Sequence, residues 1–164
     1  MSALDRTPDS TGFLQPTKFQ LSIPNLNLST LYCQEVNLPG VSIEVNIQPT
    51  PFANIPRAGS KLVHDPLSLT MIIDDGLKNW IEIHTWIEEL ANPERFSQTK
   101  YTDRYYDGIL TFYSNLNNPK LRAKFIKMFP ISISGIQMDT KSSAEETMTA
   151  TVVFKYDLFE FLPA

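Results

Sequence analysis

The stretch Tyr32–Asp75, YCQEVNLPGVSIEVNIQPTPFANIPRAGSKLVHDPLSLTMIIDD, decides the fold of this chain. It begins as a strand, and Leu38-Pro39-Gly40 predicts a turn. Residues 41–48 then alternate strictly between apolar and polar side chains. This alternation is typical of a half-buried strand with one dry face and one wet face.

A long loop is expected over residues 49–66, before a further strand begins at Leu67. It carries prolines at positions 49, 51 and 56. A loop of this length inside a compact domain is uncommon and is usually functional. No catalytic pattern accompanies it, so we expect the loop to contact another copy of the protein.

The rest of the pattern indicates a mainly β fold with one main helix, built as two packed antiparallel sheets in a sandwich or barrel. Residues 18–164 are expected to form one domain, and residues 1–17 a polar N-terminal segment that precedes it. Besides 41–48, strands are expected at 19–23, 31–36, 67–73, 109–113, 129–136, with a bulge at Gly135, and 146–161, the longest.

A helix is expected at 77–90, with Asp74 or Asp75 capping its first turn. Its apolar face is wide enough to imply contact on more than one side. One of Trp80 and Trp86 can therefore pack inward while the other faces a neighbour. A short second helix is expected at 119–127.

Composition describes an ordinary soluble globular protein of 164 residues, with a net charge of −4 and a pI near 5.1. The acidic balance argues against gripping of phosphate backbones, which needs clustered cations. The tightest basic group, expected on a solvated helical face, is Lys120, Arg122, Lys124 and Lys127. No secretory signal or membrane span is expected, so assembly in the cytosol fits best.

Candidate catalytic residues have more ordinary interpretations. Asp74 and Asp75 are adjacent, and adjacent strand residues point to opposite faces, so helix capping is the better reading. His64 beside Asp65 lacks a nucleophile and is expected to make a polar contact from the loop. His84, between the two tryptophans, is expected to be a packed side chain, because no partner stands at metal-binding spacing. No catalytic, metal or cofactor site is expected.

Two further features leave alternatives open. Cys33, the single cysteine, is expected to be a buried, inert thiol within a strand. An aromatic and basic segment could stack on sugars or bases, or equally form a protein contact. Its members are Lys100, Tyr101, Arg104, Tyr105 and Tyr106.

Taken together, the series CQEVNLPG, PTPFANIPRAG, KLVHDPLSLTMIIDD, NWIEIHTWI, FPISISGIQMDT and MTATVVFKYDLFEF resembles the tail tube proteins of contractile-tailed bacteriophages, in particular the T4-like tube family. The resemblance covers about residues 18–161. It implies subunits of two packed sheets and a flanking helix, joined as hexameric rings whose sheets form a continuous inner barrel. Stacked rings then make a hollow conduit for DNA inside a contractile sheath.

The resemblance gives the loop and the polar strand faces a role. The inter-ring contact is expected at Pro49, Pro51, Phe52, Ile55, Pro56, Arg57 and His64. A neutral to acidic bore keeps DNA phosphates from sticking. The residues expected to line it are Ser42, Glu44, Asn46, Gln48, Glu146, Thr147, Thr149 and Thr151.

The implied partners are other copies of the chain, the sheath, the baseplate and tail-terminator proteins, and viral DNA that passes without specific binding. The implied location is the virion. The repeating tube subunit is the main prediction, since the chain has an acidic balance and no extra domain. A baseplate, tube-initiator or tail-terminator ring protein is the close alternative. A β-sandwich module that binds glycan or protein is the alternative from another class.

Overall fold

The computed structural model describes residues 14–24, 26, 32–92, 104–139 and 147–163. Two antiparallel sheets share one long strand, β7 (Pro119–Ile133). On one side of the sandwich the order is β1 (Phe19–Ser22), β6 (Tyr106–Tyr113), β7 and β9 (Leu158–Pro163). On the other side β7 pairs β8 (Thr149–Lys155), which pairs β5 (Leu67–Ile72), which pairs β2 (Cys33–Asn37).

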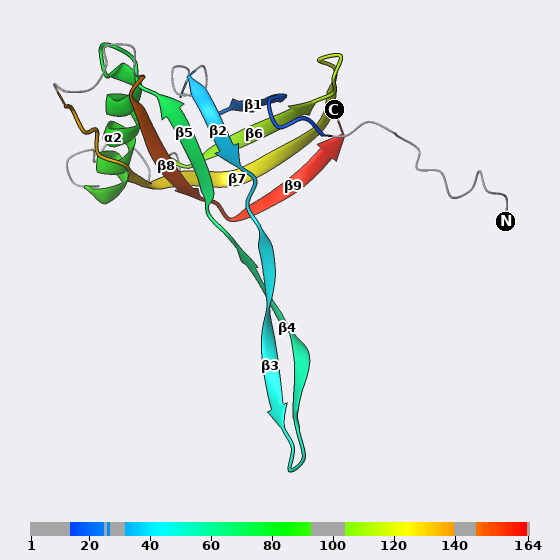
Figure 1. The fold of residues 1–164 in the computed structure, drawn as a ribbon. Helices are drawn as coiled ribbons and strands as arrows, with labels where there is room; N and C mark the ends of the chain where they lie inside the picture. Colours follow the sequence, from blue (N-terminus) through cyan, green and yellow to red (C-terminus); the bar gives the residue numbers. More distant parts are fainter. Residues whose placement is uncertain (1–13, 25, 27–31, 93–103, 140–146, 164) are drawn as a thin grey trace, which may run out of the picture.

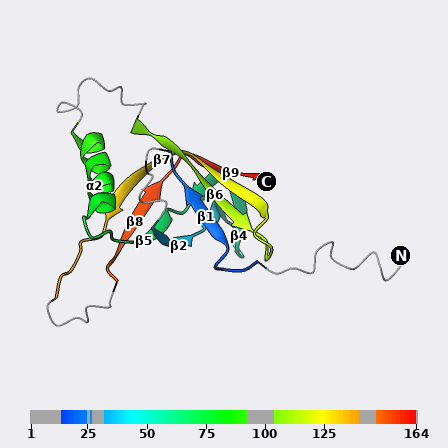
Figure 2. The ribbon, with the colours of Figure 1, turned by 90° about the horizontal axis from the view of Figure 1, so that it is seen from above.

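Figure 2 shows the two layers meeting along β7 and helix α2 (Lys78–Ala91) beside one end of the sandwich. The core between these elements is mainly apolar, with Asn79 and Arg104 as the buried polar side chains of the described residues. Alternate residues of each strand supply it, as a pleated strand with one dry face requires. Its fully buried members include Leu21, Leu67, Leu69, Met71, Ile83, Leu110, Phe125, Met128, Val152 and Phe154. The predicted mainly β architecture with two antiparallel sheets and one main helix is therefore confirmed for the described residues.

The predicted loop over 49–66 is wrong. Residues Asn54–His64 form an eleven-residue strand, β4, which pairs with β3 (Val41–Pro49) as a two-stranded ribbon. Only residues 50–53 turn the chain. Pro49 and Pro56 lie within the strands and pair with Asn54 and Ile47. In a ribbon of two strands each strand has one edge without a partner, which is where proline is tolerated.

The predicted helix at 119–127 is also wrong, because these residues are the first part of β7. Ala123 and Phe125 are fully buried between exposed or half-buried neighbours, which is the period of a strand. This segment pairs with β6 on one edge and with β9 on the other. Pairing on both edges and burial of one face outweigh the weak helical signal of the lysine-rich sequence.

The last predicted strand, 146–161, is divided. β8 ends at Lys155 and β9 begins at Leu158, so β7 rather than this segment is the longest strand. Both strands pair with the same edge of β7, and the Asp157 N–H donates to the Ile126 carbonyl at 3.1 Å between them. The expected bulge at Gly135 lies outside any strand; β7 ends at Ile133, and its register shift falls between Pro130 and Ser132.

Helix α2 confirms the predicted helix, but not its cap. Its N-cap is Leu77, which adopts a left-handed conformation with φ of 54° and makes no side-chain cap hydrogen bond. The buried Asn79 side chain organises this end instead. Its Oδ1 accepts from the N–H groups of Asp74 and Trp80, and its Nδ2 donates to the Ile72 carbonyl at 2.7 Å. The Asp74 and Asp75 carboxylates are therefore not the capping groups.

Candidate assembly interface

The β3–β4 ribbon, named the arm here, projects away from the rest of the molecule (Figure 1). It continues the β2–β5 pair without a change of register, since Asn37 pairs with Ser68 and, four residues on, Val41 pairs with His64. Every residue of β3 is exposed. The predicted half-buried strand is thus wrong for the isolated subunit, because no other part of the described chain covers either face of β3.

One face of the arm is apolar. Cross-strand partners share a face, so Ile43 lies beside Leu62, and Ile47 lies beside Pro56. Val41 and Val45 continue this row along β3, and the four β3 side chains are 48–64% exposed. An isolated ribbon of two strands is at best marginally stable in water, and a contiguous exposed apolar surface marks an interaction site. The apolar face of the arm therefore has the composition of a protein contact surface.

The opposite face of β3 is polar. It carries Ser42, Glu44, Asn46 and Gln48, which are four of the predicted bore residues. Glu44 pairs with Lys61 of β4 at 3.4 Å, and the Arg57 Nε donates to the Gln48 Oε1 at 2.7 Å. These contacts cross the ribbon and hold the polar side chains against one another. The alternation seen in the sequence thus separates two chemically different faces on the arm.

The other predicted bore residues lie on the body. Thr149 and Thr151 are exposed on the outer face of β8, where Thr151 pairs with Thr70 of β5. Thr147 is also exposed, and Glu146 lies outside the described residues. Strand β8 pairs with β5 and β7 rather than with the arm. The structure therefore places the predicted residues on two separate surfaces of one subunit.

The arm bends at a bulge and closes in a tight turn. The register shifts between Ile43 and Val45, opposite Gly59. A Cβ atom on Gly59 would lie 2.4 Å from the Glu44 carbonyl oxygen, so only glycine fits this close approach. At the tip the Thr50 N–H donates to the Ala53 carbonyl at 3.0 Å. Phe52 lies within this turn, and 99% of its surface is exposed.

A packed joint connects the arm to the body. The Asp65 N–H donates to the Gly40 carbonyl, and the Tyr156 hydroxyl donates to the Asp65 carbonyl at 2.8 Å. His64 lies in an aromatic cluster, with its ring centroid 5.8 Å from Tyr156 and 5.5 Å from Phe159. Burial raises the pKa of the Tyr156 phenol to about 12. The His64 Nδ1 is buried without a hydrogen-bond partner, so the predicted polar contact of this residue is wrong.

The tryptophans of α2 face different surroundings. Trp86 is buried, its Nε1 donates to the Arg104 carbonyl at 2.8 Å, and its ring contacts Tyr106. Trp80 is half-buried and stacks on His84 with 5.1 Å between ring centroids. His84 is thus a packed side chain, as predicted. Of the two tryptophans, Trp86 packs inward.

The described residues of the aromatic and basic segment make contacts within the subunit. Arg104 is 2% exposed and donates to the Glu89 carbonyl near the end of α2. Tyr105 makes an edge contact with Phe129 at 5.4 Å. Lys100 and Tyr101 lie outside the described residues. The described part of this segment therefore stabilises the fold, and the interpretation as an exposed binding surface is wrong for Arg104.

The remaining candidates show no reactive geometry. Cys33 is half-buried, and burial raises the pKa of its thiol from 9.0 to about 11, which favours the unreactive protonated form. Within the described ranges, no group of three His, Cys, Asp or Glu side chains is placed to hold a metal ion. No helix in the same ranges is long and apolar enough to cross a membrane.

The basic group lies on β7 and is partly neutralised. Lys124 pairs with Asp107 at 3.0 Å, and Lys127 pairs with Asp157 at 3.3 Å. The Lys127 N–H also donates to the Asp107 carboxylate, and together with Lys124 this lowers the pKa of Asp107. The expectation that this group is no nucleic-acid patch is consistent with these pairings, although the helix it was assigned to is a strand.

Comparison with known proteins identifies the fold and the family. Residues 14–162 match the family of phage tail tube proteins. The chain belongs to this family. The tail tube terminator protein of Enterobacteria phage T4 is 27% identical over 154 residues, which cover 88% of this chain and 86% of that protein.

Two solved structures share the tail tube fold. A chain of the anti-feeding prophage tube-terminating cap is superposable with a TM-score of 0.72 and 10% identity, over 100% of both chains. A chain of the sheath–tube complex of the extracellular contractile injection system PVC gives a TM-score of 0.64 and 12% identity, over 100% of this chain and 99% of that one. The protein is therefore a structural protein of the tail tube and tube terminator type.

Proposed function

We propose that this tail tube family member is the subunit of a ring that terminates the tube of a contractile phage tail. The similarity to the T4 tail tube terminator protein, over most of both chains, supports this role more directly than that of the repeating tube subunit. The sequence favoured the repeating tube subunit, with the terminator as the alternative, and the proposal reverses this order. Length and charge balance do not separate the two roles.

The observation that carries an assembly function is the arm, which exposes an apolar face that its own subunit leaves uncovered. Burying one aliphatic side chain fully contributes about 1.5–3 kcal/mol. The four β3 side chains are roughly half exposed, so covering them contributes about 3–6 kcal/mol per arm. Association costs at least about 4 kcal/mol, so one arm gives a weak contact. A closed ring of six copies adds one such contact per subunit.

The orientation of the arm follows from its two faces. The tip and both faces of the arm are proposed to contact a neighbouring subunit through Pro49, Pro51, Phe52, Ile55, Pro56, Arg57 and His64. Of these, Ile55 and Arg57 lie on the polar face, since they pair with Gln48 and Asn46. The polar residues Ser42, Glu44, Asn46, Gln48, Glu146, Thr147, Thr149 and Thr151 are proposed to line the bore. These groups let DNA pass without binding, because they are uncharged or acidic and the two cations beside them, Lys61 and Arg57, are engaged by Glu44 and Gln48.

In this role the protein has no catalytic function and no cofactor. Its other partners are the end of the tail tube and the contractile sheath, and it resides in the virion after assembly in the host cytoplasm. The fold supports such a role because free strand edges, which are templates for uncontrolled pairing, are covered when neighbouring subunits join.

Electron microscopy of the purified protein tests the proposal. We expect six-fold rings that do not elongate at high concentration, and that attach to the ends of tail tubes when these are added. Long tubes formed by this protein alone would instead identify the repeating tube subunit. Dispersed monomers that never attach to tubes would refute both roles.

A matched variant isolates the arm. Ile43 and Leu62 are paired, so replacing residues 44–61 with Asn-Gly leaves a two-residue hairpin between them. This shortened protein should unfold at nearly the same temperature as the full chain, because nearly all of the removed residues are exposed and none belongs to the buried core. It should form no rings. Normal ring formation by the shortened protein would show that the arm is not the assembly element.

A further inference from the structure

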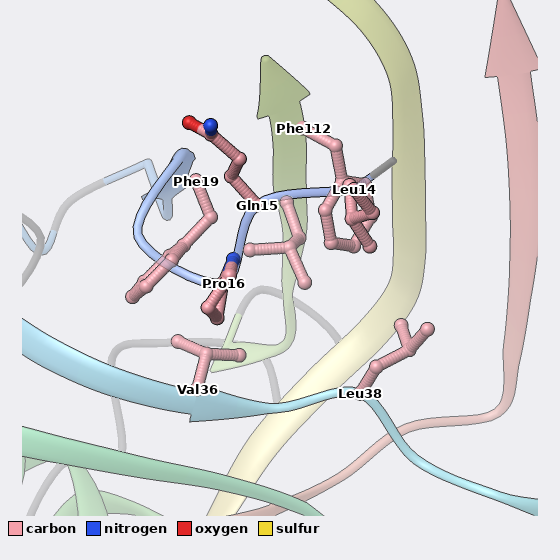
Figure 3. Close-up of a pocket in the computed structure, with 8 residues that line it drawn as sticks. Leu14, Gln15, Pro16, Phe19, Val36, Leu38 and Phe112 are labelled. Carbon is pink, nitrogen blue, oxygen red and sulfur yellow. The ribbon is translucent and has the colours of Figure 1, made fainter. Parts of the chain in front are cut away.

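An apolar pocket opens on the body of the subunit (Figure 3). Its volume is about 200 Å³. It lies between the segment that leads into β1, the end of β2 and strand β6. The residues that line it are Leu14, Gln15, Pro16, Phe19, Val36, Leu38, Leu110 and Phe112.

The chemistry of this pocket selects an apolar occupant. Gln15 is its single polar lining residue, and none of the lining residues is charged. Leu14 is 70% exposed and Leu38 is 42% exposed, so apolar surface extends past the pocket at two positions. An apolar cavity of about 150 Å³ is large enough for a benzene ring. The pocket is therefore wide enough for one phenyl group.

The same chain carries a matching group at the end of its arm. Phe52 is 99% exposed, and a phenyl ring in that position gains nothing from its own subunit. The turn that presents it is held by three hydrogen bonds between Thr50 and Ala53. The Thr50 N–H and the Thr50 hydroxyl both donate to the Ala53 carbonyl, and the Ala53 N–H donates to the Thr50 Oγ1 at 3.1 Å. Pro51 restricts the backbone immediately before it. Little conformational freedom remains to be lost when this ring docks.

Phe52 does not reach the pocket of its own subunit. The nine residues of β3 span roughly 30 Å, and the arm points away from the body (Figure 1). The joint at Gly40, Asp65 and Tyr156 holds it in that direction. A ring and a pocket that cannot meet within one molecule can meet between two.

We propose that Phe52 of one copy inserts into this pocket of a second copy. The inference rests on the proposed function only in that copies of this chain assemble. Each subunit then gives one aromatic side chain and receives one, which is a head-to-tail contact. Such contacts produce a closed ring when the rotation between subunits closes. The arm thus joins neighbours of one ring, in place of the inter-ring contact expected from the sequence, and Phe52 is the anchor of that contact.

Cysteine cross-linking tests the contact without altering either Phe52 or the apolar lining. In a Cys33→Ser background, Ala53→Cys places a thiol beside Phe52, and Gln15→Cys places one at the pocket. Disulfides form only when the two Cα atoms lie about 4.4–6.8 Å apart. Mild oxidation of the double variant should therefore give a ladder of covalent oligomers on non-reducing gels. The pairing of Ala53→Cys with Leu116→Cys, an 82% exposed position in another turn, is the control and should give no ladder.

Adding Phe52→Ala to the double-cysteine variant should abolish the ladder, and Phe52→Ala alone should weaken self-association by roughly 30-fold, as expected for an aromatic anchor. Rings seen by electron microscopy without a ladder would overturn this contact and leave the proposed function standing. A ladder without rings would support the contact and refute the ring. A ladder that persists with Phe52→Ala, or forms only with added tube protein, would overturn the contact.

Discussion

Replacing Trp86 with alanine tests whether helix α2 stabilises the subunit through this one side chain. Trp86 is 4% exposed, with its ring 4.9 Å from Tyr106 and 6.1 Å from Phe154. Truncating a buried tryptophan costs about 3–5 kcal/mol. The variant also leaves the Arg104 carbonyl without its buried donor, which costs about 1–3 kcal/mol in other proteins. We therefore expect a loss near the top of the range, about 5 kcal/mol.

Trp86→Phe separates the two contributions. It keeps most of the ring packing and removes the N–H donor, so we expect a loss of about 1–3 kcal/mol. Trp80→Ala is the matched control on the same helix. Trp80 is half-buried, packs against the edge of the core and donates from its Nε1 to the Ser134 carbonyl at 3.2 Å. We expect its loss to cost about 1–3 kcal/mol, less than the loss of Trp86, and also to weaken assembly.

Urea unfolding followed by circular dichroism measures these differences, because the substitutions remove a fluorophore. The subunits are diluted until sedimentation shows monomers, since assembly adds to apparent stability. If the slope of the free energy of unfolding against urea concentration is the same for all variants, the variants unfold between the same folded and unfolded states. Equal losses at Trp80 and Trp86 would contradict the assignment of Trp86 as the more deeply packed side chain. A loss below about 2 kcal/mol for Trp86→Ala would refute the packing argument.

Three other perturbations follow from individual contacts. Gly59→Ala should distort the arm and block assembly, because a Cβ atom there meets the Glu44 carbonyl. Gly135→Ala is the control and should assemble normally, because a Cβ atom at that position has no neighbour within 4 Å. Sedimentation measures the assembly of both variants. Cys33 should be alkylated slowly at pH 8 in the folded protein and rapidly in the unfolded protein. The free energy of unfolding should fall as pH rises from 9.0 toward about 11, because the thiol ionises at lower pH in the unfolded state than in the folded state. A free energy of unfolding that does not change across that range would contradict the burial of the thiol. Asp107→Asn should destabilise by less than about 1 kcal/mol at pH 7, because the pair is exposed. The difference should disappear as pH falls from 3.8 through the lowered pKa of the folded state, and a difference that persists in acid would exclude the carboxylate as its source.

The sequence predicted elements whose signal is local. The alternation of Leu67, Leu69 and Met71 predicted both the strand and its buried face, and all three are fully buried. Helix α2 was predicted within one residue at each end. These predictions succeed because the dry side of each element is contacted by its own subunit, so the apolar period matches the burial.

Predictions that depend on pairing between strands failed. Asn54–His64 shows no clean alternation, and its proline at 56 and glycine at 59 favour a loop. It is a strand because β3 pairs with it. The prediction for residues 119–127 also failed, because pairing on both edges decides this segment: β6 pairs with it across the turn at 114–118, and β9 pairs with it from later in the chain.

For the candidate site, the sequence by itself determined that β3 has two chemically different faces, because side-chain identity at alternate positions is a local property. Only the tertiary structure decided that both faces stay exposed. Burial depends on what else the chain places against a strand, and in the described residues nothing is placed against the arm. The pocket was equally hidden from the sequence, because Leu14, Val36 and Phe112 are brought together by three separate segments of the fold.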